Sequence, residues 1–72
     1  MCAARPHYPA DEDWVERLHW TVCAMDTDDR DLGFVASRMV FAFKDGDLSE
    51  PQQRFAFKVI DRVRPEFAAR SL

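Results

Sequence analysis

Residues 26–64 read DTDDRDLGFVASRMVFAFKDGDLSEPQQRFAFKVIDRVR, and they contain two helical patterns joined by a short turn. In residues 28–44, apolar side chains recur at the spacing of one helix face. This stripe consists of Leu32, Ala36, Met39, Val40 and Phe43. Phe34 and Phe41 project from nearly the opposite side of the same helix. A helix with two apolar faces must be covered twice, so we expect it to lie in the middle of the fold.

The turn after this helix carries the strongest local signals in the chain. Gly46 is free to adopt a positive φ and is expected to end the helix. Ser49 and Gln52 have the spacing of a capping box, in which each side chain bonds to the backbone N–H of the other residue. A further helix is therefore predicted for residues 50–64, and Pro65 is expected to stop it. The core stripe of this helix is Ala56, Val59, Ile60 and Val63.

A first helix is predicted for residues 11–25, with Asp11 as its N-cap. Its apolar face consists of Trp14, Val15, Leu18, Val22 and Met25. An alternative is a strand at residues 17–25, because apolar residues also alternate there and Trp, Val and Thr favour strands. A strand would need a pairing partner in the N-terminal arm or in a second subunit. Residues 1–10 contain two prolines and are expected to form that arm, extended along the body.

These patterns predict a small all-α domain of three helices, with residues 1–72 as a single domain and an α+β fold as the alternative. The chain is 47% hydrophobic and 32% charged and has only two glycines, which argues against a turn-rich β fold. One glycine, Gly33, lies inside a helical pattern and is expected to allow close packing against a neighbouring helix. A chain of this size buries only about 60% of its unfolded surface, so a second subunit or a disulfide would help it.

The charge is negative overall, at −3, and it is unevenly spread. Residues 1–36 hold eight acids and three bases, a balance of −5, whereas residues 37–72 hold five acids and seven bases, a balance of +2. The acids concentrate in a patch made of Asp26, Asp28, Asp29 and Asp31. They serve either as solvated helix-start residues or as a surface for a basic partner. An acidic chain is a poor general nucleic-acid binder, because phosphate neutralisation dominates that affinity.

Two cysteines, Cys2 and Cys23, occur in a chain without a signal-peptide pattern or an apolar membrane span. We therefore expect a cytoplasmic protein with reduced thiols, although one disulfide is an alternative. His19 and Cys23 are four residues apart, a metal-ligand spacing that Cys2 and His7 could complete. No C-x-x-C motif supports this set, so we predict no metal and no cofactor.

Catalysis has little support, and we predict neither enzymatic activity nor a small-molecule substrate. His19 and Cys23 could act as base and nucleophile, but they have no orienting third group or oxyanion site nearby in sequence. A DNA-binding helix-turn-helix is the alternative function. Its second helix would begin with Gln52, Gln53 and Arg54, residue types that read adenine and guanine edges.

The second apolar face of the middle helix predicts an interface. Phe34, Phe41 and Trp20 all project away from the expected core stripes. Clustered exposed aromatic residues usually mark a contact with another protein. We therefore expect these residues to form a homodimer interface or a patch that binds a host protein or nucleoprotein complex, unless the other helices bury them within the monomer.

Two segments also carry a resemblance. Residues 31–37, DLGFVAS, and residues 44–53, KDGDLSEPQQ, are similar to a two-helix module of small phage and mobile-element proteins. In that module a phenylalanine-rich helix ends in a basic-glycine turn, followed by leucine, serine or threonine, and a Lys-Gln pair; here Pro51 stands where lysine is usual. The resemblance implies a phage-type accessory protein, similar in character to anti-CRISPR inhibitors, which block a surface of a host defence complex.

Overall fold

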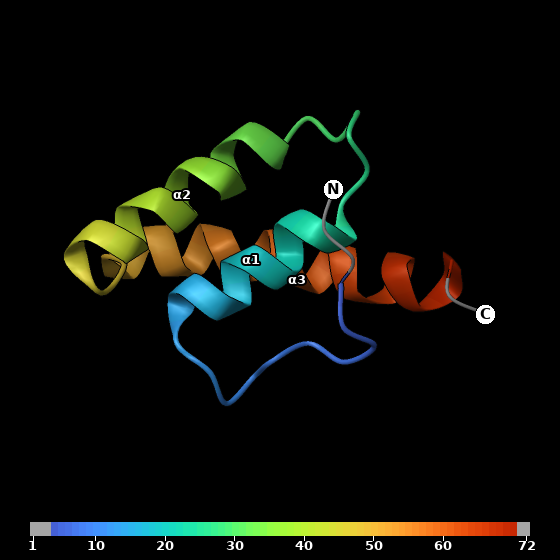
Figure 1. The fold of residues 1–72 in the computed structure, drawn as a ribbon. Helices are drawn as coiled ribbons and strands as arrows, with labels where there is room; N and C mark the ends of the chain where they lie inside the picture. Colours follow the sequence, from blue (N-terminus) through green and yellow to red (C-terminus); the bar gives the residue numbers. More distant parts are fainter. Residues whose placement is uncertain (1–3, 71–72) are drawn as a thin grey trace.

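The structure, a computed structural model, describes residues 4–70. It contains three helices, which are α1 (Trp14–Ala24), α2 (Leu32–Asp45) and α3 (Glu50–Arg70) (Figure 1). No strand occurs in the described part of the chain, and residues 17–24 lie in α1. The predicted all-α, three-helix fold is therefore confirmed, and the strand alternative is wrong.

The first helix starts later than predicted because its N-cap is Asp13 rather than Asp11. Asp13 has an extended backbone, and its side chain accepts a hydrogen bond of 3.0 Å from the backbone N–H of Glu16. This bond satisfies one of the N–H groups that a helix start leaves without a partner. The helix ends at Ala24, because Met25 returns to an extended conformation.

The second helix also starts later than predicted, at Leu32. The acidic residues before it form turns, in which the N–H of Asp29 bonds to the carbonyl of Asp26 at 3.0 Å and the N–H of Leu32 bonds to the carbonyl of Asp29 at 3.1 Å. The Asp29 carboxylate also accepts from the backbone N–H of Asp31 at 2.9 Å. Aspartate side chains compete with helix formation in this way, which explains the later start.

The turn between α2 and α3 follows the prediction. Gly46 has a φ of 84°, and its N–H bonds to the carbonyl of Ala42 at 2.7 Å. The side chain of Gln52 accepts from the backbone N–H of Ser49 at 2.9 Å, which is one half of the predicted capping box. The third helix begins directly afterwards, at Glu50.

The third helix passes through Pro65 and continues to Arg70, so the predicted stop at this proline is wrong. A proline inside a helix removes one hydrogen bond and crowds the preceding turn. Contacts beyond Pro65 offset this cost. The Phe67 ring lies 5.4 Å from the ring of Trp20, and the Arg70 guanidinium donates to the carbonyl oxygen of Ala24.

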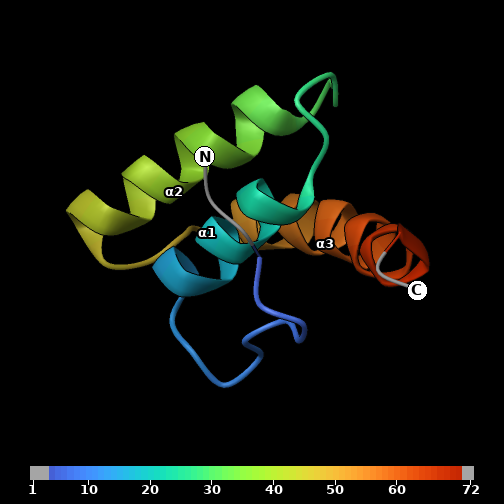
Figure 2. The same ribbon diagram turned by 45° about the vertical axis from the view of Figure 1, so that its right-hand side comes forward.

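The short helix α1, rather than α2, lies in the middle of the fold. It packs against both other helices in the space where α2 and α3 diverge from their turn (Figures 1 and 2). All three helices and two loop residues contribute to one hydrophobic core. The core consists of Trp14, Leu18, Trp20, Ala24, Met25, Val35, Ala42, Leu48, Ala56, Val59, Ile60 and Val63.

The buried face of α2 is rotated from the predicted stripe. Val35 and Ala42, seven residues apart, are each only 1% exposed, whereas Val40 is 51% exposed and Phe43 is 78% exposed. A single covering helix reaches one line of side chains, so the wide apolar surface of α2 is only partly buried. Gly33 is not used for close packing either, because a Cβ added there would have no atom within 4 Å.

The arm before α1 folds back along this helix and is fixed to it by side chains. The indole N–H of Trp20 donates to the carbonyl of Arg5 at 2.8 Å. Arg17 donates to the carbonyls of Ala10 at 2.9 Å and Glu12 at 2.8 Å. The first three residues of the predicted arm lie outside the described range.

Candidate functional site

The exposed large hydrophobic side chains of the described residues gather in one part of the molecule. They are Val40, Phe41, Phe43, Phe55 and Phe57. All five lie within residues 40–57, which form the end of α2, the turn and the start of α3; we call this set the hydrophobic tip. In both ribbon views the end of α2 and the turn extend past the start of α1 (Figures 1 and 2). The end of α2 and the turn therefore protrude beyond α1, whereas the Phe57 ring at the base of the tip packs against Trp14 of α1 at 5.0 Å.

Next to the tip in sequence, Arg38 of α2 lies against two phenylalanine rings. The Phe34 and Phe55 rings pack edge to face at 4.4 Å, which joins α2 to α3. The guanidinium carbon of Arg38 lies 5.5 Å from the ring centres of both Phe34 and Phe41. We call these four residues the aromatic–arginine cluster. Cation–π contacts of this kind hold the guanidinium against the rings.

The polar atoms of Arg38 are poorly satisfied within the described residues. Its Nε is buried without a hydrogen-bond partner, and one Nη donates to the Ser37 hydroxyl at 3.1 Å. The half-buried Arg62 is different, because it donates to the Asp29 carboxylate at 2.9 Å and to the Asp31 carboxylate at 3.2 Å. Arg38 thus carries a positive charge that the described residues do not balance.

The predicted interface residues separate into two groups. Phe34 and Phe41 belong together in the aromatic–arginine cluster, as their spacing suggested. Trp20 is only 4% exposed, so its assignment to an exposed interface is wrong. Its ring packs edge to face against Tyr8 and Phe67, both at 5.4 Å. The folded-back arm and the extension of α3 supply these covers. The arm was expected to lie along the body, but its contact with Trp20 was not predicted.

The predicted acidic patch is largely used inside the fold. Arg62 pairs with Asp29 and Asp31, and Arg70 pairs with Asp26. The backbone N–H of Asp31, followed by the Arg62 guanidinium, lowers the pKa of Asp29 below its ordinary value of 3.8. Asp28 is exposed and takes part in no ion pair within residues 4–70.

The predicted DNA-reading residues lie together at the start of α3. Gln52 accepts from Ser49, Gln53 donates to the carbonyl of Leu48 at 2.9 Å, and Arg54 pairs with Glu50 at 2.9 Å. Their polar groups therefore help to fix the turn and the first turn of the helix. Reading of base edges by these side chains stays a prediction.

Cys23 forms a disulfide bond, so the expectation of a reduced thiol is wrong at this position. Its Sγ lies 3.7 Å from Nε2 of His19, which is one helix turn away on the same face of α1. A disulfide sulfur has no thiolate with which to bind zinc. Within residues 4–70 no group of three or more His, Cys, Asp or Glu could hold a metal ion. The other cysteine, Cys2, lies outside the described residues.

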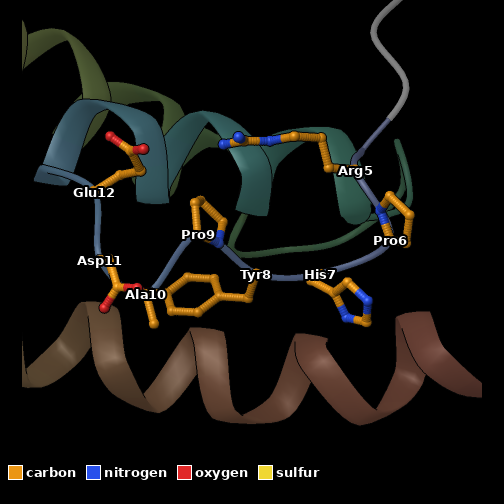
Figure 3. Close-up of a pocket in the computed structure, with 8 residues that line it drawn as sticks. All are labelled: Arg5, Pro6, His7, Tyr8, Pro9, Ala10, Asp11 and Glu12. Carbon is orange, nitrogen blue, oxygen red and sulfur yellow. The ribbon is translucent and has the colours of Figure 1, made fainter.

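The arm encloses an open hollow beside α1 and α3, with a volume of about 410 Å³ (Figure 3). Its lining is the arm itself, residues 5–12. Among these residues, His7 lies beside α3 and Glu12 lies beside α1 (Figure 3). The Tyr8 hydroxyl is buried without a hydrogen-bond partner among the described residues, and burial raises the pKa of Tyr8 above 10.0.

Comparison with known protein families, with curated proteins and with solved structures finds no match to this chain. No helix in the described part of the chain is both long and apolar enough to cross a membrane. In the hydrophobic tip and the aromatic–arginine cluster, five residues were not predicted as interface residues: Arg38, Val40, Phe43, Phe55 and Phe57. Arg38 nevertheless stands between Phe34 and Phe41 at helical spacing.

Proposed function

We propose that this chain is a non-enzymatic protein-binding module that contacts its partner through the hydrophobic tip. The observation that carries the proposal is the exposure of five large apolar side chains in one protruding segment of a 72-residue chain. Phenylalanine and arginine are enriched at protein interfaces, and exposed apolar patches are costly to keep unless they are used.

The charges at the tip favour a protein partner over a lipid surface. Asp45, Asp47 and Glu50 lie in or beside the turn at its end, and all three are exposed. Inserting this turn into a bilayer would bring carboxylates into the headgroup region, where an anionic surface repels them. A protein surface can accept apolar side chains at its centre and leave such charges at a polar rim.

The experiment is affinity capture with crosslinking in cells that naturally contain the chain. Phe43→Ser combined with Phe55→Ser removes two exposed rings, and Arg30→Ser is a matched surface change away from the tip. We expect a partner that the wild type and the Arg30 variant enrich and that the tip variant loses by at least about tenfold. Circular dichroism must show that all three proteins are folded. Recovery of the same proteins by the tip variant would refute the proposal.

A finer proposal is that the partner is a host defence complex and that binding inhibits it. It is supported by the resemblance of residues 31–37 and 44–53 to the phage two-helix module. The test uses a bacterial strain that has an active CRISPR–Cas system and is made to produce this chain. The number of plaques formed by a phage that the system targets is then counted. We expect the wild type to restore plaques and the tip variant to fail. Equal plaque counts with and without the wild type would contradict the inhibitor function for that system.

A further inference from the structure

Arg38 differs from the other half-buried arginines of the chain. Arg17 donates to two backbone carbonyls, and Arg62 donates to two aspartates. Arg38 has the Ser37 hydroxyl as its hydrogen-bond acceptor and no carboxylate or carbonyl acceptor among residues 4–70. A guanidinium carries five donors in a fixed fork that suits a carboxylate.

No acid lies within one turn of Arg38 on α2, and Asp45, two turns away at the end of this helix, forms no ion pair with it. One turn away on α2, the neighbouring positions are Phe34, Val35, Phe41 and Ala42. Across the cluster on α3, Phe55 is preceded by Arg54 and followed three residues later by Lys58, which lies on the same side of the helix. The nearest acid at the start of α3, Glu50, is already paired with Arg54.

The cluster is therefore positive, although the chain as a whole has a charge of −3. Arg38 and Lys58 have no ion-pair partner in the described part of the chain. Beside them, Phe41 and Phe55 keep part of each ring exposed. The surface thus combines unbalanced cations with aromatic faces, which is complementary to a carboxylate next to an apolar side chain.

We infer that the aromatic–arginine cluster binds an acidic protein segment, which places a carboxylate on Arg38 and an apolar side chain against Phe41 and Phe55. This inference rests on the proposed protein-binding function and specifies the chemistry of the partner. The rings shield the guanidinium from water on two sides, so a carboxylate that approaches from the open side gains more than it would at a solvated arginine. Burial of the Phe41 and Phe55 rings adds apolar contact.

The experiment uses the full chain as bait for an mRNA-displayed library of random dodecapeptides. We expect the enriched peptides to carry Asp or Glu beside an aromatic or aliphatic residue. Titration of the best peptide, followed by NMR, should perturb Phe34, Arg38, Phe41 and Phe55. Arg38→Gln should raise the Kd of this peptide by at least about tenfold, whereas Arg30→Gln, at an exposed arginine, should change the Kd by less than about twofold.

A second measurement keeps the proteins unchanged and alters the peptide. Replacing its acids by Asn or Gln should weaken binding to the wild type by at least about tenfold. Raising the NaCl concentration from about 0.05 M to about 0.5 M should weaken the binding of the acidic peptide but not that of the neutral peptide. Enriched peptides without acids, or acidic peptides that bind the Arg38 variant equally well, would overturn the inference and leave the hydrophobic tip as a binding surface.

Two other possible ligands of the cluster, a second copy of this chain and a lipid surface, give different results. Sedimentation of the wild type as a dimer that the Phe41→Ser variant converts to a monomer would assign the cluster to a second copy, and binding to phosphatidylserine vesicles in place of peptides would assign it to a lipid surface. Either result overturns the inference. A library with no enriched peptide does so as well, whereas failure of the proposed function itself would be seen in the cellular capture experiment.

Discussion

At the scale of the residue, the arginines show how one side-chain type serves two purposes. Arg62 joins α3 to the turn before α2 through two carboxylates that are largely withdrawn from solvent. The Asp29 side chain is only 10% exposed, so its loss would leave buried donors without acceptors. Arg38 has no such partner and is held by aromatic rings instead. The first arrangement stabilises the fold, and the second leaves the Arg38 guanidinium without a carboxylate partner among residues 4–70.

Asp29→Asn tests the structural network. Because the pKa of Asp29 is lower in the folded chain than its ordinary value of 3.8, the charged carboxylate stabilises the fold above that pH, and the contribution is lost as pH falls through the folded value. We expect the variant to lose roughly 1–3 kcal/mol of unfolding free energy at neutral pH and much less at about pH 2. Urea melts at both pH values measure this. Asp28→Asn is the control, and an equal effect of the two variants would contradict the network.

Gly33→Ala tests a second residue. Gly33 lies in the first turn of α2 without a positive φ, and an added Cβ would have no atom within 4 Å. We expect alanine to stabilise the chain by about 0.5–1 kcal/mol, because it restricts the unfolded chain and favours the helix. Gly46→Ala, at a φ of 84°, should destabilise it instead. Urea melts that show destabilisation by Gly33→Ala would indicate a close neighbour at this position.

At the scale of the element, the continuation of α3 past Pro65 depends on tertiary contacts. Phe67→Ala removes a ring that packs against Trp20, and we expect a loss of about 2 kcal/mol in unfolding free energy. Phe43→Ala removes a ring that is 78% exposed and should cost less than about 0.5 kcal/mol. Chemical denaturation of both variants compares them directly. Equal, small effects would mean that the end of α3 does not pack on the body.

The elements also show which parts of the fold local sequence can predict. Glycine at the end of α2 and the Ser49–Gln52 pair define the turn, because their chemistry acts within a few residues. Periodicity likewise identified the core residues Ala56, Val59, Ile60 and Val63 of α3. The buried face of α2 could not be read in the same way, since its apolar residues extend over most of the helix. Which of them are covered depends on where α1 lies.

The candidate site was predictable only in part, for the same reason. Phe34 and Phe41 lie near the same Arg38 guanidinium, because their spacing of seven residues puts them on one face of the helix. Trp20 was assigned to that surface because its covers, Tyr8 and Phe67, come from distant segments that sequence periodicity does not connect. Arg38 was not predicted because its lack of a carboxylate partner depends on how α2 and α3 pack, which sequence periodicity does not show.

At the scale of the whole molecule, the chain combines a small core with an exposed apolar tip. A domain of this size has little stability to spare, since it buries a small share of its surface. The arm compensates by packing Tyr8 against Trp20 and by bonding to α1 through Arg17 and Arg5. The disulfide at Cys23 adds a covalent restraint on the unfolded chain.

The disulfide gives the last prediction. Cys23→Ser should lower the unfolding free energy by about 2–4 kcal/mol, because the unfolded chain gains conformational freedom. A reducing agent should lower the urea midpoint of the wild type to about that of the Cys23→Ser variant, and it should not change the midpoint of the variant. EDTA should change neither protein, because a disulfide sulfur is not a metal ligand. Far-ultraviolet ellipticity in the absence of urea should stay native in all samples, since the three helices also pack on a shared hydrophobic core. A wild-type midpoint that is insensitive to reductant but lowered by EDTA would instead indicate that Cys23 binds a metal as a thiolate.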